Sequence, residues 1–180
     1  MKYFKKLEGK RIYLSPINTE DYEMYAKWMN DRNVTDGINA TNKLITIENE
    51  KEWIEKINNN ADYNFAIILK DKDILLGNCS ISKIDFIAGT AELGIMIGEE
   101  EYRSNGYGQE TLKLLLDYGF NFLRLHNICL GVFSFNERAI NCYKKVGFKE
   151  YGRRHEAYYL DGKYYDAILL EYLEYDYKNK

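Results

Sequence analysis

The chain has 180 residues, of which 46% are hydrophobic, and a formal net charge of −3. This length suits one domain with a core of its own, so we expect residues 1–180 to form a single domain. The weakly negative charge argues against a nucleic-acid-binding module, which needs a basic surface. No stretch approaches the roughly 20 apolar residues of a membrane span, and no signal peptide is evident, so a cytoplasmic protein without membrane contact is expected.

In the first half of the chain, hydrophobic periodicity and turn residues indicate helices followed by strands. Thr19 and Thr46 are suitable helix N-caps, and Pro16 marks the first strand as an edge strand. The expected elements are a strand at 11–17, a helix from 19 to about 29, a loop at 30–42 that can contain short turns, a helix from 46 to about 58, and a hairpin of strands at 64–69 and 75–84.

The central stretch from Ala91 to Leu123 predicts a strand, a polar loop and a helix. An apolar run at 93–97 has the length of a strand, and leucines recur at helical spacing from Leu112 onward. The segment 103–108, with sequence RSNGYG, lies where the loop enters the helix. Unpaired N–H groups at a helix start attract anions, and glycines let a ligand come close. The segment therefore indicates a phosphate cradle, although a loop that uses glycine only to enter a helix is the simpler alternative.

The remaining elements complete a mixed α/β sheet. They are a strand at 128–133, a helix at 137–146 ended by Gly147, and strands at 149–159 and 163–175 joined through an Asp161-Gly162 turn. Strands and helices do not alternate regularly, so a doubly wound parallel sheet is excluded.

Two segments together resemble the GNAT N-acetyltransferase superfamily. The R-x-x-G-x-G pattern at 103–108 resembles its acetyl-CoA pyrophosphate loop, and Asn136 to Phe148 resembles its N-x-x-A-x-x-x-Y-x-x-x-G-F segment. From Ala91 to about Tyr175 the chain is also similar to bacterial spermidine acetyltransferases and to the RimJ/RimL-like branch. The resemblance implies the α/β (α+β type) GNAT acyl-CoA N-acyltransferase fold, a mixed twisted sheet with splayed central strands and flanking helices.

The resemblance also implies acetyl-CoA as co-substrate and direct acetyl transfer in a ternary complex. The pantetheine arm would pair with the backbone of Met96, Ile97 and Gly98, as an added strand does. Asn136 would hold the cofactor amide or order a water, although it also suits the N-cap of its helix. The pyrophosphate would sit on the amides of Arg103, Ser104, Asn105, Gly106, Tyr107 and Gly108.

Two residues are candidates for the catalytic proton transfers. Tyr143 occupies the family tyrosine position and would protonate the leaving thiolate, since a thiol pKa near ~8.5 and a tyrosine pKa near ~10 make the step only slightly uphill. Its alternative is a helix tyrosine packed on the sheet. Glu92 would accept the amine proton directly or through water, and its alternative is a solvated carboxylate at a strand end. A covalent route through Cys142 is not favoured, because no histidine is placed in sequence to activate it.

Cysteine and histidine spacing indicates no metal site. The odd, widely spaced Cys79, Cys129 and Cys142 give neither a disulfide framework nor a metal pair. The two histidines, His126 and His155, are also too far apart in sequence for metal-ligand spacing. We therefore predict that the protein uses no metal.

The acceptor is left open by the sequence. Its pocket is expected from segments 29–45 and 151–165, and a polyamine would find carboxylates at Asp31, Asp36, Glu92 and Glu156. The first half, however, does not reproduce the acid-rich pattern of spermidine acetyltransferases, so a peptide N-terminus, an amino sugar or an aminoglycoside is also considered. A non-catalytic CoA-binding sensor is the rival from another functional class. The tyrosine-rich C-terminal hairpin predicts a homodimer or larger homo-oligomer.

Overall fold

The computed structural model describes residues 2–179, which form one eight-stranded sheet in the order β1-β2-β3-β4-β5-β6-β8-β7. Neighbouring strands are antiparallel except for the central β5–β6 pair, which is parallel. The predicted mixed sheet is therefore confirmed. The strands are β1 Leu7–Glu8, β2 Ile12–Pro16, β3 Tyr63–Leu69, β4 Ile74–Asp85, β5 Thr90–Ile97, β6 Asn127–Phe133, β7 Lys149–Leu160 and β8 Lys163–Leu173.

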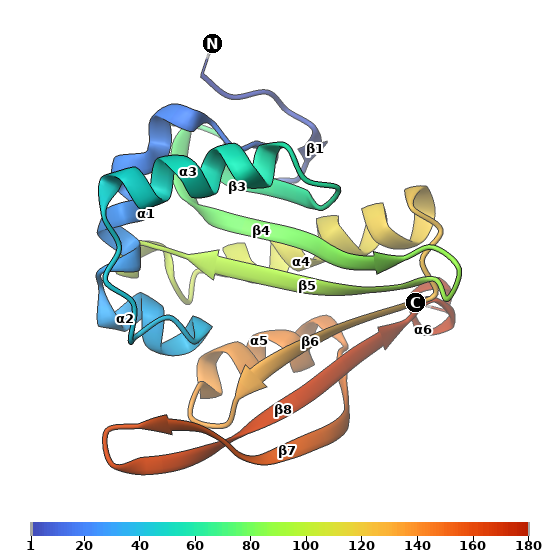
Figure 1. Cartoon of the computed structure of the whole chain (residues 1–180). Helices are drawn as coiled ribbons and strands as arrows, with labels where there is room; N and C mark the ends of the chain where they lie inside the picture. The colour runs from blue at the N-terminus through green and yellow to red at the C-terminus, as the bar shows by residue number, and fades with distance from the viewer. Residues whose placement is uncertain (1, 180) are drawn as a thin grey trace.

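Helices cover both faces of the sheet, with α1 and α3 on one face and α4 and α5 on the other (Figure 1). Because side chains alternate along a strand, neighbouring residues of β2 enter different cores. Ile12 and Leu14 pack toward α4, whereas Tyr13 packs toward α1. The helices are α1 Tyr22–Met29, α2 Arg32–Thr35, α3 Ile47–Asn58, α4 Tyr107–Asp117, α5 Glu137–Val146 and α6 Glu174–Lys178.

Several local signals act as the sequence predicts. Thr46 caps α3 in a reciprocal capping box with Asn49. Gly147 ends α5 at φ 120°, and the β7–β8 turn places Asp161 and Gly162 at φ 46° and 84°. The predicted apolar face of α4 is buried at Leu112, Leu115 and Leu116.

Other boundaries differ from the sequence-based expectation. Segment 30–42 contains the short helix α2 and a 3-10 turn at Asp36–Ile38, and the last strand ends at Leu173, where α6 begins. The edge position of the first strand was wrong, because β2 lies between β1 and β3. Pro16 is tolerated because it ends β2, beyond the two residues that pair with β1.

The parallel pairing of β5 with β6 is short and ends at Glu92 opposite Cys129. Beyond this point β5 stays paired with β4 as far as Ile97, while β6 stays paired with β8 as far as Phe133. The two central strands therefore diverge and open the middle of the sheet, as Figure 1 shows. From Leu93 to Ile97, the backbone N–H and C=O groups of β5 that point away from β4 therefore pair with no strand of the described chain.

The surface carries the exposed tyrosines that the sequence predicts for the C-terminal hairpin. Tyr151, Tyr159 and Tyr164 are each more than half exposed. Self-association through this surface stays a prediction. Among residues 2–179, no helix is long and apolar enough to cross a membrane, and no group of three or more metal-ligating side chains gathers.

Candidate active site

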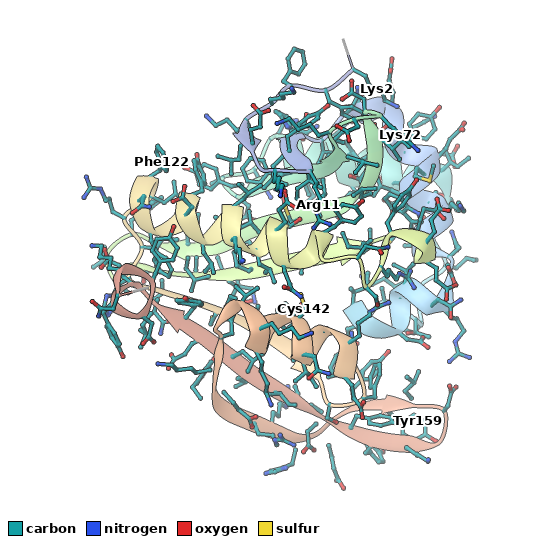
Figure 2. All side chains as sticks on the ribbon, turned by 180° about the vertical axis from the view of Figure 1, so that it is seen from behind. Lys2, Arg11, Lys72, Phe122, Cys142 and Tyr159 are labelled. Carbon is teal, nitrogen blue, oxygen red and sulfur yellow. The ribbon has the colours of Figure 1, made fainter. Side chains whose placement is uncertain are left out.

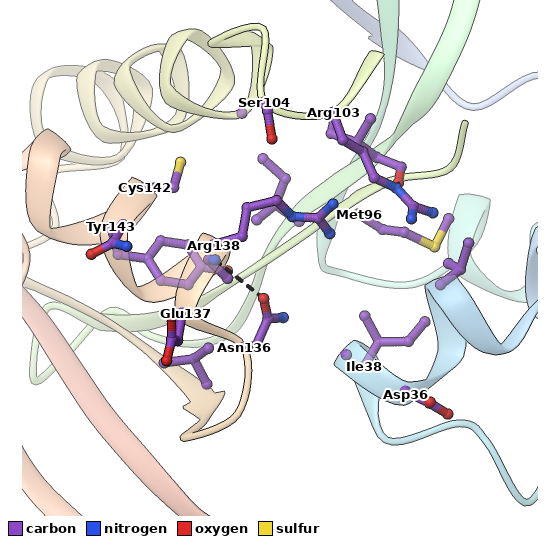
Figure 3. A pocket seen from close by; sticks show the side chains of 18 of the residues that line it. Asp36, Ile38, Met96, Arg103, Ser104, Asn136, Glu137, Arg138, Cys142 and Tyr143 are labelled. Carbon is purple, nitrogen blue, oxygen red and sulfur yellow. Dashed lines mark hydrogen bonds between the residues drawn. The ribbon is translucent and has the colours of Figure 1, made fainter. Parts of the chain in front are cut away.

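The opening between β5 and β6 leads into a cleft of about 720 Å³. Its walls come from β5, the start of α4, the first turns of α5 and the α2 segment. Figure 3 shows Asn136, Arg138 and Tyr143 on one side of the cleft, with Asp36 and Ile38 on the other. The cleft thus brings together segments more than 100 residues apart.

The loop before α4 has the backbone shape of an anion cradle. Ser104 and Gly106 have φ of 61° and 83°, and Gly106 is the residue before the first turn of α4. No side chain caps this eleven-residue helix in the described structure, so its first amides remain for a ligand. Arg103, Ser104, Gly106 and Gly108 line the cleft.

The other two loop residues face the protein. The Asn105 amide donates to the carbonyl oxygens of Glu101 (2.8 Å) and Arg103 (3.1 Å), so it shapes the loop. The Tyr107 ring lies under the guanidinium of Arg11, at 4.6 Å. Figure 2 shows Arg11 beside α4. Arg11 donates to Asn105 O and to the Glu110 carboxylate, both at 2.9 Å. Arg11 therefore holds the cradle from outside, a contact that sequence reasoning missed.

Arg103 is turned toward backbone carbonyls. Its Nε donates to Ile97 O (3.1 Å), Nη2 to Gly98 O (2.7 Å) and Nη1 to Asn33 O (3.2 Å). A guanidinium has five N–H donors, so it can make these three hydrogen bonds at once. Arg103 thus ties the end of β5 to α2 and spends three donors within the protein.

The backbone of β5 corrects the expected pairing residues. Gly98 N–H donates to Leu76 O (2.8 Å) on β4, so it is not available to a ligand, and Gly98 does not line the cleft. Hydrogen-bonding direction alternates along a strand, so the N–H and C=O of Ile95 and the N–H of Ile97 point toward the gap, while the groups of Met96 point to β4. The Ile97 carbonyl already accepts from Arg103 Nε. Met96 presents its side chain to the cleft. The alternating hydrogen-bond direction of a strand was the signal that could have identified Ile95 as a pairing residue from the sequence.

Tyr143 lies in the wall of the cleft, on α5. Its residue is only 8% exposed, and its ring packs edge-on against Phe148 at 6.0 Å. Burial raises the pKa of the Tyr143 hydroxyl above its ordinary value. The hydroxyl therefore remains protonated at neutral pH, which a proton donor requires.

Asn136 lines the cleft and caps α5. Its Oδ1 accepts from Ala139 N at 3.2 Å, which confirms the capping interpretation. Its Nδ2 lies 3.0 Å from the position that a Cβ on Gly37 would occupy. The amide side chain therefore sits close against the α2 segment.

Glu92 is not brought to the cleft wall. It is the last β5 residue paired with β6, and its carboxylate binds Lys83 Nζ at 2.8 Å. Its side chain is 46% exposed. Ile95, the nearest cleft residue on the same strand, is three positions away, or about 10 Å. Any proton transfer between Glu92 and a bound amine would have to pass through water.

The opposite mouth of the cleft is closed by contacts between α2, its following loop and the β7–β8 hairpin. Arg32 donates to both oxygens of Asp161, at 2.9 and 3.0 Å. The Thr41 hydroxyl lies 2.9 Å from the Tyr158 hydroxyl and donates to Asp36 at 2.7 Å. A second cavity of about 490 Å³ lies among these residues and shares Arg32 with the main cleft.

Few carboxylates face the main cleft. Among the four acids that the sequence offered for a polyamine, Asp36 lines the cleft, whereas Asp31 caps α2. Glu137 of α5 is a further carboxylate of the lining. These two carboxylates lie among four basic side chains of the lining, and Asp36 is paired with Arg32 at 3.4 Å.

The chain matches the model of the Acetyltransferase (GNAT) domain over residues 11–149. The spermidine N(1)-acetyltransferase of Vibrio cholerae is 31% identical over 133 residues, which cover 74% of this chain and 76% of that protein. The uncharacterized N-acetyltransferase p20 of Bacillus licheniformis is 26% identical and covers 95% of this chain and 97% of its own.

Solved structures share the whole architecture. The crystal structure of the Vibrio cholerae spermidine N-acetyltransferase with CoA and spermine is 26% identical, with a TM-score of 0.83 over 94% of this chain and 99% of that chain. A GNAT acetyltransferase of Bacillus anthracis, 22% identical, superposes with a TM-score of 0.82 over 94% of this chain and 98% of that chain. The fold implied by the sequence motifs is therefore confirmed.

Proposed function

The chain belongs to the GNAT acetyltransferases and is an acetyl-CoA-dependent N-acetyltransferase, and we propose that it acetylates a primary amine of an aliphatic polyamine by direct transfer. One observation carries the proposal. A single cleft joins the uncapped start of α4 to the α2 segment, and Tyr143 lies in its wall. A donor and an acceptor can therefore meet at that tyrosine.

The donor is assigned to the α4 side of the cleft. Its pyrophosphate lies on the amides of the 103–108 loop, and its pantetheine arm pairs with the backbone of Ile95 and Ile97. This arm then occupies the place beside β5 that β6 leaves open. Asn136, close to the same wall, contacts an amide of the arm.

The transfer needs proton movements at the amine and at the leaving thiolate. The neutral amine attacks the thioester carbonyl, the C–N bond forms, and collapse of the tetrahedral intermediate breaks the C–S bond. Tyr143 gives its proton to the departing thiolate, and bulk water restores that proton. Before the attack, the ammonium form of the acceptor gives one proton to Glu92 through intervening water, because the carboxylate lies outside the cleft wall. After the attack, the nitrogen gives its second proton to bulk water.

The polyamine assignment has two supports. The Vibrio cholerae relatives are named for spermidine, and one of their structures holds spermine. The two carboxylates of the cleft lining, Asp36 and Glu137, can each pair with an ammonium group of such an acceptor. A peptide N-terminus, an amino sugar and an aminoglycoside are the competing acceptors.

The test is release of CoA from acetyl-CoA, followed with a thiol reagent. The acceptor panel contains spermidine, spermine, N-terminal peptides, amino sugars and aminoglycosides. We expect the highest kcat/KM with spermidine or spermine. A higher kcat/KM with another class would contradict the polyamine assignment. Binding of acetyl-CoA without CoA release from any acceptor would leave the sensor interpretation in its place.

A further inference from the structure

Four basic residues line the cleft. Two of them are bound to other protein groups, and a third lies near the far end of α5. Arg32 is bound to Asp161, and Arg103 is bound to three carbonyl oxygens. Lys145 is exposed near the end of α5. The fourth is Arg138, in the first turn of α5.

The Arg138 guanidinium is open to the cleft. Within residues 2–179, no hydrogen bond or ion pair engages it. Figure 3 shows it extending from α5 across the cleft in the direction of Met96. Arg138 is solvent-exposed as a residue, but partial desolvation and, secondarily, the charge of Arg103 lower its pKa. A partly desolvated guanidinium that lies near a second one is stabilised by a bound anion.

The position of Arg138 points to the anion site at α4. Arg138 and Cys142 are four residues apart and share one face of α5. Cys142 Sγ lies only 3.6 Å from the position that a Cβ on Gly108 would occupy, and Figure 2 shows Cys142 between the two helices. Arg138, one turn nearer the start of α5, therefore lies across the cleft from the first amides of α4.

We propose that Arg138 binds the pyrophosphate of CoA opposite the amides of the 103–108 loop, and this inference rests on the proposed donor site. The motif arginine, Arg103, spends three of its five donors on carbonyl oxygens, so Arg138 provides a second guanidinium whose donors are all available to the anion. A guanidinium can bind two phosphate oxygens at once, and the neutral amides at the helix start donate further hydrogen bonds to the same group. The two motifs thus form one site, with amides from the first and a cation from the second.

The test is the affinity of Arg138→Gln for CoA and for 3′-dephospho-CoA, measured by calorimetry. Loss of a charge-assisted bond predicts a Kd increased about ten- to hundredfold for CoA. The same factor is expected for 3′-dephospho-CoA, because the pyrophosphate is common to both. Arg138→Lys should recover part of the loss. Lys144→Gln removes a charge from an exposed position of the same helix outside the cleft lining, and its Kd should match the wild type.

Each other result has a distinct meaning. A loss that disappears with 3′-dephospho-CoA would assign Arg138 to the 3′-phosphate and overturn the inference. An unchanged Kd, or a reduced kcat at saturating acetyl-CoA with unchanged Kd, would also overturn it. Failure of the wild-type protein itself to bind CoA would instead contradict the proposed donor site.

Discussion

The two ends of the cleft are built in different ways. The backbone part of the donor end comes from one continuous stretch, in which β5, the 103–108 loop and α4 follow each other, and α5 adds side chains to it. The acceptor end joins segments 117 and 129 residues apart through the Thr41–Tyr158 and Arg32–Asp161 contacts. A site made of local backbone is recognisable as a motif, whereas a site made of distant side chains is not.

The two ends also differ in rigidity. At the donor end, a Cβ on Gly98, the residue after β5, would lie 2.0 Å from the fully buried Trp28 ring, so the backbone packs directly against that ring. At the acceptor end, the side chains of Arg32 and Asp161 are 58% and 70% exposed, which makes their ion pair weak. Substrate choice can therefore change at the mouth without disturbing donor binding.

Tyr143 lies between the two ends, and its substitution should have the largest effect. For Tyr143→Phe we expect kcat to fall about 10²- to 10⁴-fold, because the thiolate loses its proton donor, with little change in thermal stability. Steady-state kinetics across pH check this. Burial raises the pKa of Tyr143, so the wild type should show no loss of the acid below pH ~10, the ordinary tyrosine value. An unchanged kcat across pH would remove the acid role.

Glu92 lies where β5 and β6 diverge, outside both ends of the cleft, and its substitution should have the next largest effect. For Glu92→Gln we expect kcat/KM to fall about 10²-fold, the lower end for general base catalysis, because we propose that the proton reaches this carboxylate only through water. The loss should shrink as pH rises and more acceptor is neutral. Lys83→Gln, which removes the ion-pair partner, is the control for the local charge change. A loss independent of pH would show that Glu92 supports structure only.

Gly98→Ala tests the rigidity of the donor end. Overpacking against Trp28 should lower the free energy of unfolding by about 3 kcal/mol. For a chain of this length, that loss corresponds to a Tm lower by about 6–12 °C. Gly131→Ala is the matched control, because its Cβ would meet nothing nearer than Leu169 at 4.0 Å. Equal Tm values for the two variants, measured by differential scanning calorimetry, would show that β5 can move.

The weakest effect is expected at the mouth. Asp161→Ala breaks an exposed ion pair worth less than about 1 kcal/mol, so the acceptor KM should change by no more than about fivefold. The KM for acetyl-CoA should stay constant, because the donor end is separate. Asp176→Ala removes an equivalent surface pair with Lys149 and is the control. A change in the acetyl-CoA KM would mean that the two ends are coupled.

The sequence by itself determined most elements and the donor loop. Hydrophobic periodicity, the caps at Thr46 and Gly147 and the Asp161-Gly162 turn depend on residues that are near neighbours in the chain. The same holds for the glycine loop before α4, which works through its own backbone. Such features require no knowledge of what packs against them.

Tertiary structure alone decided where the side chains of these elements point. Arg103 belongs to the donor motif, yet its guanidinium donates to carbonyl oxygens at the end of β5 and in α2. The N–H of Gly98 donates to a carbonyl oxygen of β4. Glu92 lies on the central strand, yet the divergence of β5 from β6 leaves it outside the cleft. These outcomes depend on contacts between residues that are far apart in sequence. Such contacts form only after the chain has closed the intervening loops, so local sequence patterns do not encode them.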